Sequence, residues 1–207
     1  MKVTTIFSVC CFCLLLQTST ALTQNKTPLR ANPTALLAPL GLPDHGGRIE
    51  TKYDGFNHET VVTLQKMRVT CAGAKGMQSA LKDTCVSLLA SLHCPGQQLD
   101  YVRHARLQLI FEAKDWSQRH PLDERDLIVV ADGERLPLGT MRLVKQDMDT
   151  NQLIDVMKEV LEVALPYPTF QKIARAQVVE VKVGKTTFEL AEKNLAALRD
   201  LNNRVKP

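Results

Sequence analysis

The sequence predicts an α+β fold, with an antiparallel β-sheet or β-sandwich followed by C-terminal helices that have a β-hairpin between them. Apolar and polar residues alternate with period two through most of residues 60 to 114, which predicts strands with one buried face. Asp132 and Gly133 separate two apolar runs, a strong signal for a tight hairpin turn. Apolar residues return at helical spacing in residues 192 to 204.

Three strands are expected in the first part of the chain. In residues 60 to 71 the inward set is Val61, Thr63, Met67, Val69 and Cys71. In residues 84 to 94 it is Val86, Leu88, Ala90, Leu92 and Cys94. In residues 106 to 114 it is Leu107, Leu109, Phe111 and Ala113. The polar residues between them predict a sheet whose second face is in contact with water.

The next two strands are expected to form a hairpin. Residues 127 to 131 are all apolar, which is typical of a central strand. The Asp-Gly turn that follows fits type I′, because both central residues need a positive φ angle. Residues 134 to 144 then form the second strand, which Pro137 and Gly139 mark as an edge strand or a bulged one.

The period changes after this hairpin. Asp149 and Thr150 can cap a helix that runs to about Leu165 and ends before Pro166. Its expected apolar stripe is Leu153, Val156, Met157, Val160, Leu161 and Ala164.

The C-terminal part adds a short helix, a hairpin and a last helix. The short helix is expected over residues 170 to 176, and the hairpin over residues 177 to 190 around Gly184 and Lys185. A glycine at the first turn position suits a type II′ turn. The last helix, residues 192 to 204, carries Leu195, Leu198 and Leu201 on one side.

The first 21 residues have the layout of a secretory signal peptide. Lys2 precedes an uncharged apolar run that ends at Leu16, and Ser19 and Ala21 supply small residues for a cleavage site. The run is shorter than the roughly 20 residues that cross a bilayer. We therefore expect cleavage after Ala21 and a secreted or periplasmic protein with no transmembrane segment in the mature chain. Residues 22 to 50 are rich in proline and glycine and read as a linker, and residues 51 to 205 as a single domain.

Three segments carry a resemblance to a known group of proteins. They are Tyr53-Asp54-Gly55-Phe56 with the strand that follows, the stretch from Leu127 to Leu136, and the stretch from Phe170 to Leu201. Together they resemble a group of secreted bacterial proteins of unknown function. The resemblance implies an exported bacterial protein, and it carries over no catalytic residue.

Composition and motifs exclude several classes of function. Charged residues make up 23% of the chain and aromatic residues 5%, and the formal net charge is +4. This balance is too even for a nucleic-acid partner, and the basic group of Arg103, His104 and Arg106 lacks interleaved aromatic residues. The chain contains no phosphate-binding loop, nucleophile elbow, H-E-x-x-H or dinucleotide fingerprint. We expect no cofactor.

The cysteines after the signal peptide are Cys71, Cys85 and Cys94. If one bridge forms, we expect it to join Cys71 to Cys85, which close the connection between the first two strands. Cys85 and Cys94 are separated by roughly 30 Å of extended chain, too far for a disulfide. The alternation places Cys71 on the apolar face of its strand and Cys85 on the polar face of its own, which counts against this bridge. Three free thiols remain an alternative.

Two clusters of residues are candidates for chemistry, and one loop is a candidate for binding. Cys94 next to His93 is a candidate nucleophile pair, but adjacent strand residues point to opposite faces. His93, Cys94 and His104 match no zinc spacing, so no metal is expected. The loop that contains Asp115, Trp116, Arg119 and His120 is a candidate ligand loop, because ionisable groups gather there around the only tryptophan.

The first hypothesis for function is therefore an exported, non-enzymatic binding or structural module. It would present one sheet face or its loops to an unknown protein or small ligand. The second is a secreted hydrolase with a Cys/His nucleophile pair.

Overall fold

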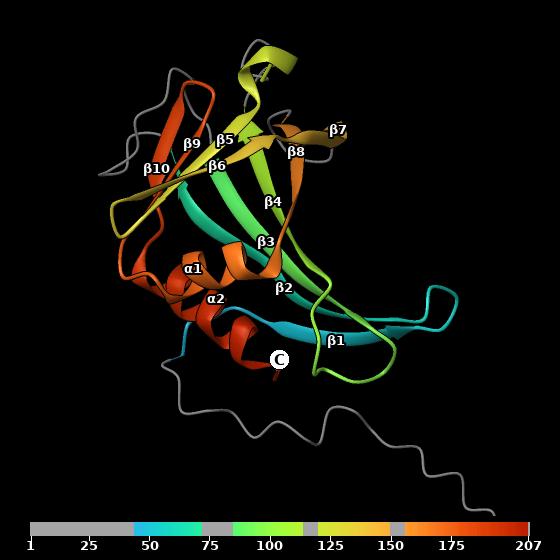
Figure 1. Ribbon diagram of the computed structural model, residues 1–207. Coiled ribbons are helices and arrows are strands. Elements are labelled where there is room, and N and C mark those ends of the chain that lie inside the picture. The colour runs from blue at the N-terminus through green and yellow to red at the C-terminus, as the bar shows by residue number, and fades with distance from the viewer. Residues whose placement is uncertain (1–43, 72–84, 114–119, 150–155, 207) are drawn as a thin grey trace, which may run out of the picture. The chain divides into compact units, whose positions relative to one another are not determined.

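The computed structural model describes residues 44–71, 85–113, 120–149 and 156–206. The chain divides between Asn32 and Pro33 into two units, and all of the described residues belong to the second. These residues form two antiparallel sheets, two α-helices and one short 3-10 helix, η3 (Leu122–Glu124). The predicted α+β class is confirmed (Figure 1).

The larger sheet has six strands in the order β1-β2-β3-β4-β8-β7, and every neighbouring pair is antiparallel. Its strands are β1 (Ile49–Asp54), β2 (Glu59–Cys71), β3 (Cys85–Pro95), β4 (His104–Ala113), β7 (Arg142–Asp149) and β8 (Val156–Leu165). The first of them begins two residues before the expected start of the domain. β3 and β4, the most regularly alternating segments of the sequence, lie at the centre of the sheet.

The smaller sheet has four strands in the order β10-β9-β5-β6. They are β5 (Asp126–Ala131), β6 (Glu134–Thr140), β9 (Val179–Val183) and β10 (Thr186–Glu189). β5 is central, as its all-apolar sequence predicts. β6 is an edge strand, where Pro137, which has no backbone N–H to donate, is tolerated.

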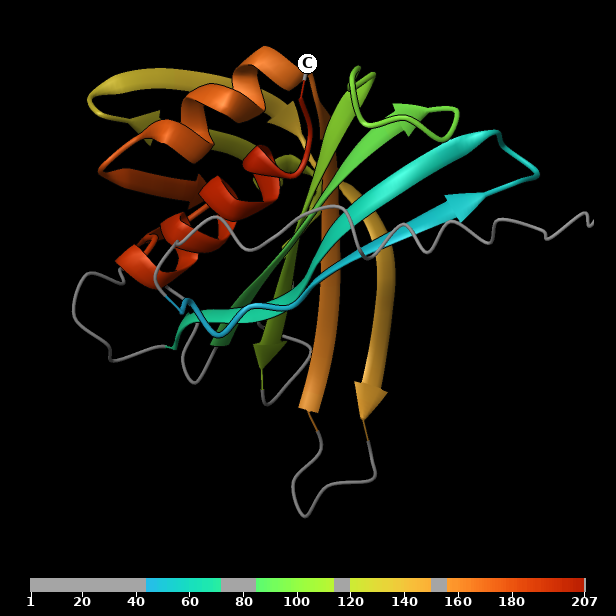
Figure 2. The same cartoon turned by 90° about the horizontal axis from the view of Figure 1, so that it is seen from below.

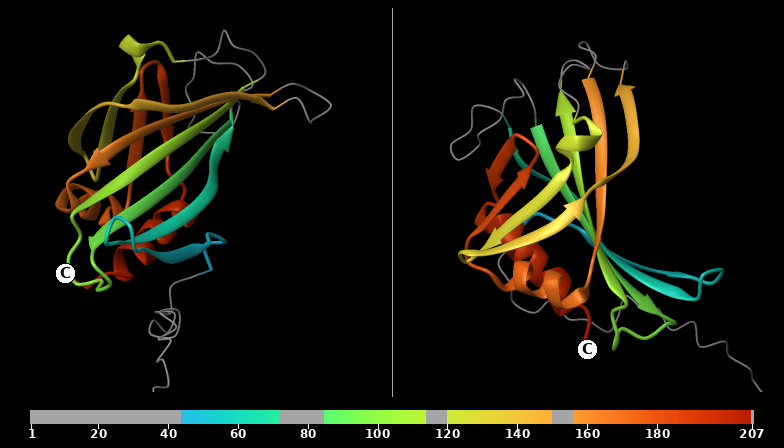
Figure 3. Two further views of the ribbon diagram at one scale, coloured as in Figure 1. Left: turned by 90° about the vertical axis from the view of Figure 1, so that its right-hand side faces the viewer. Right: turned by 45° about the horizontal axis from the view of Figure 1, so that its top comes forward.

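The core lies between one face of the larger sheet and a layer made by the smaller sheet and the helices α1 (Tyr167–Arg175) and α2 (Glu192–Asn203). Figures 2 and 3 show both helices and the smaller sheet on the same side of the larger sheet. Leu195, Leu198 and Leu201 of α2 are buried in this core, as their helical spacing predicts. The predicted short helix is confirmed as α1 and the second hairpin as β9–β10.

The expected faces of β2 need a correction. Val62 and Leu64, not Val61 and Thr63, are the buried residues in its first half. The register with β3 slips between Leu64 and Met67, and again between Arg68 and Thr70. Each slip adds one residue to β2, and an added residue turns the following side chains to the opposite face. A strict alternation through residues 60 to 71 was therefore wrong.

The same two bulges explain the disulfide. Cys71 lies directly opposite Cys85 in the β2–β3 ladder, and the two are bonded. Strict alternation would have placed Cys71 on the core face, away from Cys85. The second bulge turns Cys71 to the outer face, where Cys85 already lies. The predicted pairing is confirmed.

The helix expected from Asp149 to Leu165 is wrong, because residues 156 to 165 form strand β8. β8 lies between β4 and β7 and pairs with both along its length. One face of β8 is buried. It carries four apolar side chains, Met157, Leu161, Val163 and Leu165, and Glu159 lies among them on the same face. Because the charged Glu159 interrupts the alternation of apolar residues, the sequence of this segment fits the spacing of a helix better than that of a strand. Residues 150 to 155, the expected start of this helix, lie outside the described residues.

The predicted Asp-Gly hairpin joins β5 to β6. Asp132 has φ +48° and Gly133 has φ +85°, as a turn with two positive φ angles requires. β6 contains the expected bulge, since Leu127 pairs with Gly139 and Ile128 with Pro137. The expected strand over residues 134 to 144 does not continue through this region. It ends at Thr140, and after Met141 the chain enters the larger sheet as β7.

Candidate functional site

Of the four residues in the candidate ligand loop, only His120 is described, and Asp115, Trp116 and Arg119 lie outside the described residues. His120 is buried. Its backbone N–H donates to Glu159 Oε2 over 3.1 Å, and its ring Nδ1 lies 2.7 Å from the same oxygen. His120 therefore anchors the segment before β5 inside the core.

Cys94 and His93 lie on opposite faces of β3, as adjacent strand residues do. Cys94 is fully buried in the core. Burial, with smaller effects from the charges of Glu59 and Asp100, raises the pKa of the Cys94 thiol to about 11. A thiol in this state supplies almost no thiolate near neutral pH, so the geometry does not support a Cys94–His93 nucleophile pair. Among the described residues, no three His, Cys, Asp or Glu side chains gather to hold a metal ion.

Polar side chains from several strands gather on the face of the larger sheet that points away from the helices. We call this face, which carries Ser91, His93, His104, Arg106 and Glu162, the open face. The left panel of Figure 3 looks toward it. These residues come from three neighbouring strands, β3, β4 and β8, whose register brings them side by side. No helix of the described residues covers them.

Two histidines stand next to each other at one end of the open face. His93 of β3 is paired in register with His104 of β4. Their rings are stacked, with centroids 4.5 Å apart and planes inclined by 13°. Burial lowers the pKa of His104, and the nearby His93 and Arg106 lower it further. Arg106 Nε also donates a hydrogen bond to His104 Nε2 over 3.3 Å, which requires that nitrogen to be unprotonated.

A serine and a glutamate flank His93. Ser91 Oγ lies 3.1 Å from His93 Nε2. On the other side of the ring, His93 Nδ1 lies 3.1 Å from Glu59 Oε2, although it makes no hydrogen bond of good geometry with a described residue. Ser91 and His93 are both buried to more than nine-tenths. Three groups of different chemistry are thus lined up along one edge of the face.

Glu162 links the other half of the open face. Gln108 Nε2 and Arg142 Nη2 each donate a hydrogen bond to its carboxylate over 2.7 Å, and Arg106 Nη1 lies 4.0 Å away. Burial on its own would raise the pKa of Glu162, but the hydrogen bonds and the charges of both arginines outweigh it and lower that pKa. Glu162 is therefore ionised at neutral pH. Together with the histidines, these contacts make a continuous polar chain from Glu59 to Arg142.

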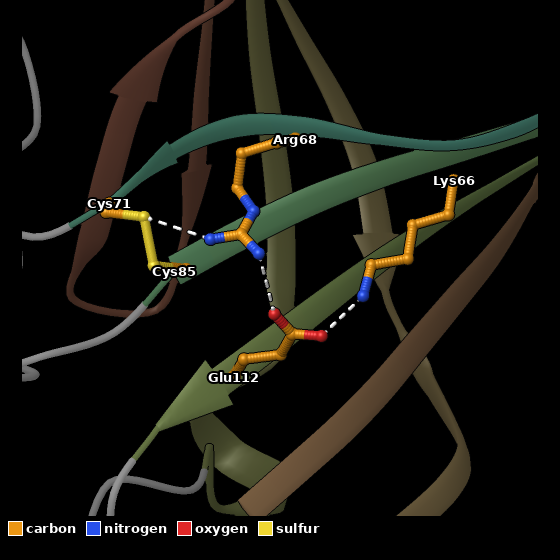
Figure 4. Close-up of a disulfide and its surroundings, with 5 residues drawn as sticks. All are labelled: Lys66, Arg68, Cys71, Cys85 and Glu112. Atoms are coloured by element: carbon orange, nitrogen blue, oxygen red, sulfur yellow. Dashed lines mark hydrogen bonds and ion pairs between the residues drawn. A yellow bond between two sulfur atoms is a disulfide. The ribbon is translucent and has the colours of Figure 1, made fainter. Parts of the chain in front are cut away.

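The disulfide closes the opposite end of the face (Figure 4). Cys85 is paired in register with Glu112 of β4. The Glu112 carboxylate forms ion pairs with Lys66 and Arg68, both from β2. Arg68 Nη1 also lies 3.3 Å from Cys71 Sγ. The disulfide and this ionic cluster hold β2, β3 and β4 in register where β2 is bulged.

A separate hollow of about 470 Å³ lies at the β1–β2 turn, lined by residues 52 to 56 and Val61. Phe56 is fully exposed at the tip of this turn. Asp54 holds the turn, because its carboxylate accepts hydrogen bonds from the backbone N–H groups of Phe56 and Asn57. All of its lining residues lie between positions 52 and 61, so the hollow brings together no residues that are distant in sequence.

Sequence reasoning named His93, His104, Arg103 and Arg106 but did not group them with Ser91, Glu59 and Glu162. The reason is that the order of strands across a sheet cannot be read from their order in the chain. One signal was present: Ser87, Ser91 and His93 lie on the same face of β3, with Leu89 between the two serines. Buried polar side chains of a central strand are usually hydrogen-bonded to neighbours; here Ser91 contacts His93, whereas Ser87 Oγ has no hydrogen-bonding partner among the described residues.

Comparisons with protein-family models, with curated proteins and with solved structures found no match for this chain. In the described part of the chain, neither helix has the length and apolar character needed to span a membrane.

Proposed function

We propose that this chain is an exported binding module whose open face holds a small polar ligand that carries a carboxylate. The observation that carries the proposal is the continuous polar chain from Glu59 to Arg142. Burying two of its members, His93 and Glu162, has a desolvation cost that aliphatic side chains on a purely structural face would not incur. In ligand sites a small number of convergent polar groups fixes the orientation of the ligand.

The charges on this face favour an anionic ligand. Arg103, Arg106 and Arg142 contribute three positive charges, and Glu59 and Glu162 contribute two negative ones, so the sum is +1 (3 − 2) with neutral histidines. The side chains of Arg103, Arg106 and Arg142 are 56%, 42% and 69% exposed. Guanidinium groups bind carboxylates through paired hydrogen bonds.

Export is supported by two features of the chain. Residues 1 to 21 have the layout of a signal peptide. The Cys71–Cys85 bridge fits an oxidising compartment, where disulfides form and persist. N-terminal sequencing of exported protein should begin at Leu22, and recovery of an intact Met1 form in membranes would contradict export.

Binding is tested by thermal unfolding of the exported protein with succinate, citrate, glutamate, inorganic phosphate and glucose, each added alone. A ligand that binds only the folded state raises Tm. We expect a rise with at least one of the carboxylates and none with glucose. Arg106→Gln should abolish the rise, whereas Arg48→Gln, at an exposed arginine outside the open face, should keep it. Equal responses in both variants, or no response in the unaltered protein, would contradict the proposal.

A further inference from the structure

The geometry points to an acyl-transfer activity on the open face, with Ser91 as nucleophile, His93 as general base and Glu59 as the residue that positions His93. This inference goes beyond ligand binding, and it does not require the carboxylate ligand proposed above. It rests on how three side chains are ordered along the face: Ser91 Oγ is 3.1 Å from His93 Nε2, and His93 Nδ1 is 3.1 Å from Glu59 Oε2.

Each distance corresponds to one requirement of nucleophilic catalysis. A serine hydroxyl is a weak nucleophile until a base within hydrogen-bonding reach accepts its proton. His93 Nε2 lies within that reach. A third group must hold the imidazole in the tautomer that leaves Nε2 without a proton. Glu59 lies on the Nδ1 side of the ring and can accept a hydrogen bond from the N–H there.

The contact between His93 and Glu59 has the distance but not the angle of a hydrogen bond. Such contacts are often poorly aligned without substrate and tighten when it binds. The stacked ring of His104 restrains the other motions of His93, because the two planes are nearly parallel.

Arg106 is the group available to stabilise the negative charge that develops on the substrate. It lies directly opposite Ser91 on β4. Backbone amides cannot form the usual oxyanion hole beside Ser91, because β3 is paired on both sides and its N–H groups are used in the two ladders. A guanidinium can supply the same positive charge. Since the Arg106 side chain is 42% exposed to water, we expect slow turnover.

The reaction is hydrolysis of a carboxylic ester in two balanced steps. Ser91 Oγ adds to the ester carbonyl while its proton passes to His93 Nε2. The alkoxide then leaves, takes up that proton and departs as the alcohol, and the acyl group remains on Ser91. Water attacks this acyl-enzyme as His93 Nε2 takes its proton, the carboxylic acid departs, and the proton returns to Ser91 Oγ. No oxidant, reductant or cofactor takes part.

The first test is covalent labelling of the native protein with a fluorophosphonate, followed by peptide mapping. The adduct should be found on Ser91 and not on Ser87. Ser87 is a matched control because it lies on the same strand and face, is fully buried, and has no hydrogen-bonding partner among the described residues. A protein that remains unlabelled, or is labelled equally at both serines, would overturn the proposal.

The second test is steady-state hydrolysis of p-nitrophenyl acetate. Ser91→Ala and His93→Gln should each lower kcat/KM by on the order of 10²-fold or more, and Ser87→Ala should leave it unchanged. Glu59→Gln should lower kcat with little change in KM and shift the pH profile, which a purely structural residue would not do. Full activity in folded Ser91→Ala, judged by circular dichroism and Tm, would overturn the assignment.

A third variant keeps the proposal testable if Ser91→Ala fails to fold. Ser91→Cys places a thiol beside His93 at little change in size, and it should react with iodoacetamide much faster than Ser87→Cys does. Cys94 contributes no background, because its thiol is buried and its pKa is raised to about 11. Equal reaction rates for the two variants would show that His93 does not activate position 91. These outcomes do not decide whether the unaltered protein binds a carboxylate. The binding proposal and the hydrolase proposal can therefore be contradicted independently of each other.

Discussion

Glu159 accepts hydrogen bonds from both the backbone N–H and the ring of His120, although the two residues are 39 positions apart and the carboxylate is fully buried. Arg125 Nη2 approaches the other carboxylate oxygen to 3.8 Å, and Arg125 Nε donates to the His120 carbonyl over 2.9 Å. The ring of Phe111 covers His120, with the ring centroids 4.3 Å apart. These contacts attach the start of β5 to the centre of β8.

Removing one member of this buried pair should be strongly destabilising. His120→Ala leaves the Glu159 carboxylate buried without its main partner, and such a change costs about 3–5 kcal/mol of unfolding free energy. Lys172→Ala is the matched control, because Lys172 and Glu134 are 2.6 Å apart but more than half exposed, and pairs of this kind contribute at most about 1 kcal/mol. Urea unfolding measures both. Similar losses for the two variants would mean that burial does not set the strength of the His120–Glu159 interaction.

The two hairpin glycines should differ in their response to substitution. At Gly133, which has φ +85°, an added Cβ would meet nothing within 4 Å, so Gly133→Val should lose only the conformational cost of about 1–2 kcal/mol. At Gly184 the Cβ would collide with the carbonyl oxygen of Glu124. Gly184→Ala should therefore lower Tm by more than Gly133→Ala does. The opposite order would show that the Glu124 segment moves aside without cost.

Breaking the disulfide should destabilise the domain through the unfolded chain. Cys71 and Cys85 are separated by 14 positions, and closing a loop of this size is worth about 3 kcal/mol in the chain-entropy model. Comparison of the Cys71→Ser/Cys85→Ser double variant with the oxidised protein in urea measures the difference. A thiol count on the exported protein supplies the control: one thiol, that of Cys94, should react, and only after unfolding. Three reactive thiols would contradict the bridge.

His104 should make the domain less stable in mildly acidic solution. Its pKa is lowered from 6.5 by burial and by His93 and Arg106, so the unfolded chain takes up the proton before the folded one does. As pH falls below 6.5, the unfolded state gains protons and stability declines, until the folded state also becomes protonated at its lower pKa. The urea midpoint should fall less between about pH 7.5 and about pH 5 in His104→Gln than in the unaltered protein. Parallel pH dependences would rule out His104 as the cause.

The central strands could be predicted from sequence because their local pattern and their environment agree. β3 and β4 alternate cleanly, and every inward residue expected for β3 is buried. β8 could not be predicted, because a charged residue occupies one of its core positions. The partner that makes Glu159 tolerable there is His120, which lies far away in sequence. The predicted faces of β2 were wrong for a related reason. The two bulges depend on how β2 pairs with its partner strand, and no pattern within residues 60 to 71 indicates them.

The candidate site depended even more on long-range arrangement. Ser91 and His93 are close in sequence, but Glu59 joins them through the β2–β3 ladder and Arg106 through the β3–β4 ladder. Glu162 reaches Arg106 and Gln108 only because β8 pairs with β4. The strand that delivers Glu162 was expected to be a helix, so its place beside these residues was beyond sequence reasoning.

Met141 has a consequence for how the domain comes apart. It is the one residue between β6, which belongs to the smaller sheet, and β7, which belongs to the larger. Its side chain is buried and its N–H is bonded to the Arg125 carbonyl over 2.9 Å. Because the connection between the two sheets is a single residue, we expect that neither sheet can unfold locally while the other stays folded. Calorimetry should accordingly show one transition with equal calorimetric and van't Hoff enthalpies, and amide protons in β6 and β7 should exchange through the same cooperative opening.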